Sequence, residues 1–191
     1  MDWAHAELAE VDPGKGFWVF AYGSLMWNPG FTVESRTLAH LPGYRRSFCM
    51  SSIVYRGTPE APGLVLALDR AEGEGCSGVA YRVAPECGEE ALAYLREREL
   101  VSSAYREVLA EVHLDDDGSH RTALAYVMDR DHAQYCGTLS ADEQAEIIAR
   151  AAGPAGSNRE YLMNTAQALH RLGLEDAALF DLVERVRRLP L

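Results

Sequence analysis

The sequence predicts an α+β fold in which a small, curled antiparallel β-sheet or barrel is flanked by α-helices. Segments rich in Val, Tyr, Phe and Leu, each bounded by Gly, Pro or Asp, dominate the chain up to residue 128. One helical pattern interrupts them, and helical patterns dominate the remainder. Strands that come first and helices that come last are typical of α+β folds.

Six segments are expected to form strands because they combine β-branched, aromatic and leucine residues with turn residues at their ends. Their ranges are 17–22, 44–55, 64–69, 77–83, 105–114 and 121–128. The last two are separated by Asp-Asp-Asp-Gly at 115–118, which is a turn sequence. We therefore expect these two strands to form a hairpin.

Four helices are expected from apolar spacing and capping signals. The first covers 85–100. The second begins at Ser140 and the third at Ser157, since a Glu follows each serine by three residues, the pattern of a capping box. The last is marked by apolar residues between 178 and 186.

The length and hydrophobic content suit one domain. The chain has 191 residues, of which 48% are hydrophobic, enough for a sizeable core. Residues 1–15 are polar and end in Asp-Pro-Gly, so they are predicted to be a loosely ordered lead-in. Residues 16–191 are predicted to form a single domain.

Charge and hydropathy exclude several classes of protein. A net charge of −11 disfavours nucleic acid and anionic membranes as partners, because both require a basic surface. No apolar run approaches the ~18 residues of a membrane span, and no basic start precedes an apolar stretch as in a signal peptide. The four cysteines lack Cys-x-x-Cys spacing. We expect a cytoplasmic protein with reduced thiols, whose oligomeric state the sequence does not determine.

The first expected strand runs into a Gly-Ser loop. Tyr22, Gly23, Ser24 and Leu25 follow the apolar and aromatic residues of 17–21. Gly23 can take a positive φ, and its missing Cβ lets another group approach the backbone closely. Successive N–H groups in such a loop can converge on an anion.

A carboxylate occupies an unexpected position in the first helix. At about 100° per residue, Glu99 falls on the stripe formed by Ala91, Leu92 and Leu95, whereas Glu97 points to the opposite side. A carboxylate held toward an apolar core has a raised pKa, which suits proton transfer near neutral pH. The alternative is a structural ion pair with Arg96, Arg98 or Arg106, or fraying of the helix end.

Four ordered motifs resemble the γ-glutamylcyclotransferases, and in particular their ChaC branch. They are Tyr-Gly-Ser-Leu-Met-Trp at 22–27, Gly-Tyr-Arg-Arg-Ser-Phe at 43–48, Tyr-Arg-Gly-Thr-Pro-Glu-Ala-Pro-Gly at 55–63 and Gly-Pro-Ala-Gly-Ser-Asn-Arg-Glu-Tyr-Leu at 153–162. The resemblance covers about residues 16–180.

The resemblance implies a small antiparallel barrel with flanking helices and an enzyme that cyclises a γ-glutamyl group into 5-oxoproline. For the ChaC branch the substrate is glutathione and the second product is cysteinyl-glycine, with no metal or other cofactor. The family's catalytic Glu corresponds to Glu99, and its substrate loop to residues 22–25. Tyr105 and Tyr161 correspond to tyrosines near the substrate. The spacing between Glu99 and Tyr105 is longer than in the Arg-Glu-Lys-Gly-Gly-Tyr form of eukaryotic members.

The chemistry explains why these groups suffice. The α-amine of the glutamyl unit attacks its own γ-carbonyl, so the enzyme must fold the substrate and move a proton. Glu99 is expected to take the amine proton and return it to the departing nitrogen. Arg45, Arg46 and Arg56 are candidates for the distant glycine carboxylate, with salt bridges inside the sheet as their alternative.

Other interpretations remain at this level. The substrate could be another γ-glutamyl amino acid or amine, because the loop and Glu99 recognise only the glutamyl part. Ser24 could be a hydrolytic nucleophile, although no Gly-x-Ser-x-Gly motif is present. His113 and His120 flank the hairpin turn, but without a His-x-x-x-His pair we expect polar hairpin residues and no metal site. A binding or regulatory protein without catalysis is the remaining class.

Overall fold

The computed structural model describes residues 8–190. The strands are β1 Phe17–Ala21, β2 Ser35–Ser52, β3 Gly63–Val83, β4 Tyr105–Leu114, β5 His120–Met128, β6 Ala152–Gly153 and β7 Gly156–Ser157. The α-helices are α1 Gly88–Glu99, α2 Ala141–Arg150, α3 Asn158–Leu172 and α4 Ala177–Arg188. Short 3-10 helices are η1 Pro13–Lys15, η2 Ser24–Met26 and η3 Pro85–Cys87.

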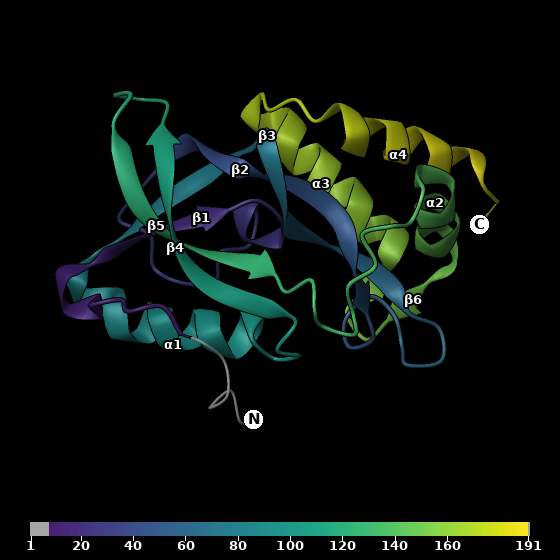
Figure 1. The fold of residues 1–191 in the computed structure, drawn as a ribbon, viewed down its shortest axis with the longest axis horizontal. Helices are drawn as coiled ribbons and strands as arrows, with labels where there is room; N and C mark the ends of the chain where they lie inside the picture. Colours follow the sequence, from purple (N-terminus) through teal and green to yellow (C-terminus); the bar gives the residue numbers. More distant parts are fainter. Residues whose placement is uncertain (1–7, 191) are drawn as a thin grey trace. The chain divides into compact units, whose positions relative to one another are not determined.

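The five longer strands form a closed barrel in the order β1-β3-β2-β4-β5 (Figure 1). β1 is antiparallel to β3, as β4 is to β2 and to β5. β5 is parallel to β1 and to β3. The α+β class and the barrel are confirmed, but the barrel is mixed rather than wholly antiparallel. Chain connectivity decides this: β1 lies between β3 and β5, and only one of these neighbours runs against it.

The predicted hairpin is confirmed, with β4 and β5 in register from Tyr105 opposite Met128 to His113 opposite His120. Elsewhere the strands are longer than expected. β2 begins at Ser35 rather than at 44, and the two strands predicted at 64–69 and 77–83 are one strand, β3. Most of the additional residues are polar, Gly or Pro and at least partly exposed, so they lack a continuous apolar strand pattern, although Ala39, Leu41 and Cys76 among them are buried. Pairing with neighbouring strands keeps them extended despite this weak local preference.

The chain divides into two compact units. The first comprises residues up to Arg46 together with Leu68–His132, and the second comprises Ser47–Ala67 together with the residues from Ala133 onward. Large apolar and aromatic side chains from the barrel and from α1 are fully buried in the first unit. They include Phe20, Leu41, Tyr81, Leu95, Leu124 and Tyr126.

In the second unit, α2, α3 and α4 pack against one another (Figure 1). Ile148, Leu162, Leu169 and Val186 from these helices are fully buried. The capping box at the start of α2 is confirmed, because the Ser140 side chain accepts from the Glu143 N–H and the Glu143 side chain accepts from the Ser140 N–H.

The third helix has a different start. Ser157 caps α3 by accepting from the Glu160 N–H, as predicted. The Glu160 carboxylate, however, lies 3.5 Å from Arg56 in an ion pair. A carboxylate is drawn to a nearby guanidinium more strongly than to a neutral N–H.

A buried asparagine joins α3 to the beginning of β3 within the second unit. The Asn158 side chain is fully buried; its Oδ1 accepts from the Leu64 N–H at 2.6 Å and its Nδ2 donates to the Leu64 carbonyl at 2.6 Å. Just before Leu64, Gly63 lies so close to Gly57 that a Cβ on Gly57 would lie 2.1 Å from the Gly63 nitrogen. These contacts account for the asparagine and two of the glycines in the motifs.

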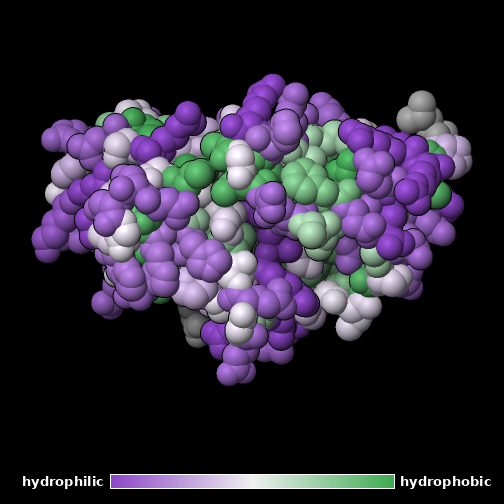
Figure 2. Space-filling model, turned by 90° about the horizontal axis from the view of Figure 1, so that it is seen from above, coloured by the Kyte–Doolittle hydropathy of each residue, from purple (hydrophilic) through white to green (hydrophobic). Residues whose placement is uncertain are grey.

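Two expectations from the sequence remain predictions. The lead-in at 1–15 lies partly outside the described residues, and within it Pro13–Lys15 forms η1. The single-domain organisation of 16–191 also stays a prediction. None of the helices in the described residues is both long and apolar enough to span a membrane. The face in Figure 2 is largely hydrophilic, in keeping with a chain in which 25% of residues are charged.

Replacing Asn158 with Ala is expected to lower the free energy of unfolding by about 2–5 kcal/mol, because both backbone groups of Leu64 would be left buried without a partner. Urea denaturation measures this. Gln167→Ala, on the exposed face of the same helix, is the control and should change stability by less than about 0.5 kcal/mol. Equal effects of the two substitutions would contradict this role of Asn158.

Candidate active site

The Gly-Ser loop directly follows β1 and forms the short helix η2. Tyr22 and Leu25 are buried. Gly23 precedes η2 with φ −130° and ψ −132°, so it does not use the positive φ that is open to a glycine. The turn is instead made by η2, in which Met26 N–H donates to the Gly23 carbonyl at 2.9 Å. The first N–H groups of a helix have no partner within the helix, which leaves this loop with donors for an anion.

Hydrogen bonds between the loop and three barrel residues hold the loop in place. The Tyr81 hydroxyl donates to the carbonyls of Leu25, at 3.2 Å, and Met26, at 3.0 Å. Arg46 Nε donates to the Tyr22 carbonyl at 2.6 Å. The Tyr22 hydroxyl donates to the Tyr126 carbonyl at 3.1 Å. These contacts hold both ends of the loop against the barrel.

Glu99 is the last residue of α1 and lies on the face that the sequence predicted. Ala91, Leu92 and Leu95 are buried, Glu97 is exposed, and the Glu99 side chain is only 15% exposed. Burial raises the pKa of the Glu99 carboxyl, and the neighbouring Arg98 charge opposes this rise. The fraying that would have released Glu99 to water does not occur.

Arg98 connects Glu99 to the loop. Its Nε lies 3.1 Å from Glu99 Oε1, and its Nη2 donates to Ser24 Oγ at 2.8 Å. Its Nη1 donates to the Asn28 carbonyl at 2.8 Å and to the Tyr94 hydroxyl at 2.9 Å. The guanidinium therefore brings the loop and the carboxylate to one place. The sequence named Arg98 only as an ion-pair partner and missed its contact with Ser24.

A second buried carboxylate belongs to Glu107 on β4. Its side chain is fully buried and is held by Arg96, whose Nη2 lies 2.8 Å from Oε1. The Tyr126 hydroxyl donates to Oε2 at 3.0 Å, and the Ala9 N–H donates to Oε1 at 3.1 Å. Burial raises the pKa of Tyr126, and the Glu107 charge adds to the rise. With a guanidinium and two further donors, Glu107 is committed to structural contacts.

The two predicted tyrosines lie in different units. Tyr105 is the first residue of β4, opposite Met128, and follows Glu99 after the connection 100–104. This connection turns at Ser103, which has φ 54°. Tyr161 on α3 belongs to the second unit. A role for Tyr161 in substrate binding stays a prediction.

Arg45 and Arg56, two of the arginines suggested for a distant carboxylate, have protein partners in the structure. Arg45 pairs with the buried Asp69 at 3.1 Å. Arg56 lies 5.5 Å from the Tyr161 ring centre and 3.5 Å from Glu160.

The third arginine, Arg46, donates to the backbone carbonyls of Tyr22 and Ser77, each at 2.6 Å. Its contacts therefore favour positioning of the loop. Tyr81, which the sequence analysis missed, has the same effect; its position in a strand contains no signal of this contact.

Comparisons with known proteins agree on one family. The family model described as ChaC-like protein matches residues 17–189. A glutathione-specific γ-glutamylcyclotransferase of Escherichia coli (strain K12) is 39% identical over 178 residues, which covers 93% of this chain and 76% of the relative. γ-Glutamylcyclotransferase 2-3 of Arabidopsis thaliana is 35% identical over 182 residues, covering 90% of this chain and 89% of the relative.

The fold is also similar to a solved structure. A crystal structure of a γ-glutamyl cyclotransferase specific to glutathione from yeast superposes with a TM-score of 0.82 at 28% sequence identity. The similarity covers 91% of this chain and 96% of that one. The fold is therefore shared over nearly the full length of both proteins.

Replacing Arg98 with Gln is expected to raise the pKa of Glu99 further, because the Arg98 charge is what opposes the effect of burial. The carboxyl ¹³C shift of Glu99, followed through a pH titration by NMR, measures this. Arg106→Gln is the control, since Arg106 pairs with Asp129 at 3.1 Å instead. A Glu99 titration that is the same in Arg98→Gln as in the wild type would contradict the assignment.

Proposed function

The chain belongs to the ChaC-like protein family, and we infer that it is a glutathione-specific γ-glutamylcyclotransferase, a lyase that splits glutathione into 5-oxoproline and cysteinyl-glycine. The observation that carries this function is the 39% identity to an enzyme of that name over 93% of this chain. Substrate recognition and the roles of individual residues are proposals argued from the contacts described above.

In the proposed reaction the substrate supplies its own nucleophile. The α-amine of the glutamyl unit attacks the γ-carbonyl carbon, a C–N bond forms, and the amide bond to cysteine breaks. The tether removes much of the entropic cost of bringing the two groups together. The protein must hold the glutamyl chain in a folded shape and must move a proton from the attacking nitrogen to the leaving nitrogen.

Glu99 is proposed to move this proton. Its ionised carboxylate accepts a proton from the α-ammonium group, and the resulting carboxylic acid returns that proton to the departing amide nitrogen. The second proton, which the attacking nitrogen loses as the lactam forms, passes by the same carboxylate to the leaving amine, which departs as an ammonium. Two features support the role. Burial makes the carboxylate a stronger base, and the Arg98 charge keeps it ionisable. Glu107 is less suited, because a guanidinium and two other donors already hold its oxygens.

The loop at 22–25 is proposed to bind the glutamyl α-carboxylate. Its backbone N–H groups at the start of η2 and the hydroxyl of Ser24 are the donors. Arg98 contacts both Ser24 and Glu99, so an α-carboxylate on the loop would place the adjacent α-amine toward the general base. Tyr105 and Tyr161 are each proposed to bind the substrate, as the family resemblance implies.

Glutathione and other γ-glutamyl compounds differ only in the leaving group that is attached to the glutamyl unit. The Arabidopsis relatives are named γ-glutamylcyclotransferases. Other γ-glutamyl amino acids or amines are the alternative substrates. The glutamyl-binding loop and Glu99 would serve either class. A cytoplasmic location remains a prediction from the sequence.

Glu99→Gln is expected to lower kcat for glutathione by at least about 100-fold, because Gln retains the shape of Glu but cannot accept a proton. Release of 5-oxoproline and of cysteinyl-glycine, quantified by mass spectrometry, is the measurement. Glu97→Gln is the matched control: it lies two positions away on the exposed face of the same helix and should retain full activity.

The stability of Glu99→Gln shows whether a loss of activity comes from a loss of catalysis or from a loss of folding. A raised pKa means that the folded state binds the Glu99 proton more tightly than the unfolded state does. This contribution to stability is complete below the unfolded pKa and is lost as pH rises through the folded pKa. Glu99→Gln should therefore be at least as stable as the wild type at pH 8. A stable, fully active Glu99→Gln enzyme would exclude Glu99 as the general base.

Ser24→Ala is expected to keep measurable turnover, with a KM raised by roughly 10-fold, because it loses one charge-assisted hydrogen bond. Steady-state kinetics with glutathione measure this. The same variant tests the alternative that Ser24 is a nucleophile, since a nucleophile's loss would remove turnover rather than weaken binding. Undetectable turnover in a correctly folded Ser24→Ala protein would favour that alternative.

A further inference from the structure

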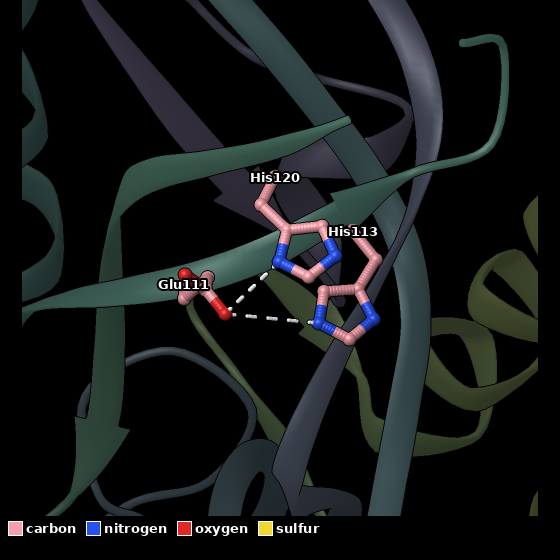
Figure 3. Close-up of side chains that lie close together, drawn as sticks. All are labelled: Glu111, His113 and His120. Carbon is pink, nitrogen blue, oxygen red and sulfur yellow. Dashed lines mark hydrogen bonds and ion pairs between the residues drawn. The ribbon is translucent and has the colours of Figure 1, made fainter. Parts of the chain in front are cut away.

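A group of metal-ligating side chains lies beside the turn of the β4–β5 hairpin (Figure 3). Glu111 and His113 come from β4, two residues apart and therefore on one face of the strand. His120 is the first residue of β5 and lies opposite His113 in the last pair of the ladder. The three side chains thus meet on one face, although Glu111 and His120 are nine positions apart in the sequence.

The donor atoms of this group converge. Glu111 Oε1 lies 3.2 Å from His120 Nδ1 and 3.9 Å from His113 Nε2, and all three atoms lie within 4.8 Å of one another. The two imidazole rings are stacked, with centroids 4.1 Å apart and planes 18° apart. Figure 3 shows both rings presenting a nitrogen toward the Glu111 carboxylate. One oxygen and two nitrogens therefore surround a common point.

We propose that Glu111, His113 and His120 bind a transition-metal dication of the Zn²⁺ type. Two imidazoles and one carboxylate are the donors that such ions prefer, whereas Ca²⁺ and Mg²⁺ take oxygen ligands. Metal–ligand bonds of about 2.0–2.1 Å place the ligands of a tetrahedral ion about 3.3 Å apart. Rotation of the exposed side chains brings the three donors to that spacing, and water completes the coordination.

Accessibility and charge favour the same conclusion. The side chains of Glu111, His113 and His120 are 65%, 42% and 54% exposed, so an ion reaches them without any opening of the fold. The hairpin turn adds three aspartates at 115–117. Arg121, the basic residue that follows His120, lies 3.7 Å from Asp117 in an ion pair. The surroundings of the site are therefore acidic, which favours a dication.

The site is separate from the proposed catalysis. His113 lies eight positions after Tyr105 on β4, which at about 3.4 Å per residue corresponds to about 27 Å along the strand. A bound ion would cross-link β4 and β5 just before their turn and so stabilise the hairpin. His40 on β2 lies next to His113, with ring centroids 6.4 Å apart. Its Nδ1, however, is 3.3 Å from Ser77 Oγ. We therefore leave His40 out of the ligand set.

Isothermal titration calorimetry of the metal-free protein with ZnCl₂ at pH 7.5 tests the proposal. The wild type should bind one equivalent. His113→Ala and His120→Ala should each weaken binding by at least about 10-fold, because even an outer-shell partner of a metal ligand contributes 10–100-fold. Glu111→Gln keeps the side-chain shape, loses the charge and should also bind more weakly. The control is His170→Ala, an exposed histidine on α3, which should bind as the wild type does.

Two further readouts make the result decisive. Thermal unfolding should shift upward with Zn²⁺ in the wild type but not in His120→Ala, because only a ligand that prefers the folded state stabilises it. Co²⁺ should give visible absorption without the intense near-ultraviolet band of a thiolate ligand. The absence of binding to the wild type, equal binding by all variants, or a thiolate band from a cysteine would each overturn the proposal. Turnover is not the readout, because the thiol of glutathione competes for the metal.

Discussion

The geometry of the candidate active site depends on one guanidinium group, that of Arg98. It contacts Glu99 on its own helix, Ser24 on the loop after β1, and the Tyr94 hydroxyl and Asn28 carbonyl beside them. A planar group with five N–H donors holds several partners in fixed directions, which a lysine cannot do. Its charge also opposes the rise in the pKa of Glu99. Positioning and acid–base strength are therefore set by the same side chain.

Two buried carboxylates, Glu99 on α1 and Glu107 on β4, have different environments. Glu107 is surrounded by Arg96, Tyr126 and the Ala9 N–H, which supply donors to both of its oxygens. Glu99 keeps a raised pKa beside a single guanidinium. Proteins give two carboxylates different pKa values by placing them in different surroundings, so that one is structural and the other is reactive. The proposed proton transfer uses Glu99, because its carboxylate has fewer protein partners than that of Glu107.

Much of the fold was predictable because its local patterns agree with its packing. The strand ranges of β4 and β5, the cap at Ser140 and the apolar stripe that includes Glu99 follow from residue spacing alone. The failures have physical causes as well. The middle of β3 is polar, so it lacks a strand pattern, and pairing in the barrel keeps it extended. The Glu160 carboxylate pairs with Arg56, which is distant in sequence but close in space, and does not complete the capping box with the N–H of Ser157.

The sequence by itself determined the α+β class, the family motifs and the identity of Glu99 as a carboxylate on an apolar helix face. It could do so because burial leaves a periodic trace in the chain. Only the tertiary structure decided which polar groups meet: Arg98 with Ser24, Arg96 with Glu107, Asn158 with Leu64, and His113 with His120. These contacts depend on barrel closure and strand register, and a shift of one residue would turn each strand side chain to the opposite face.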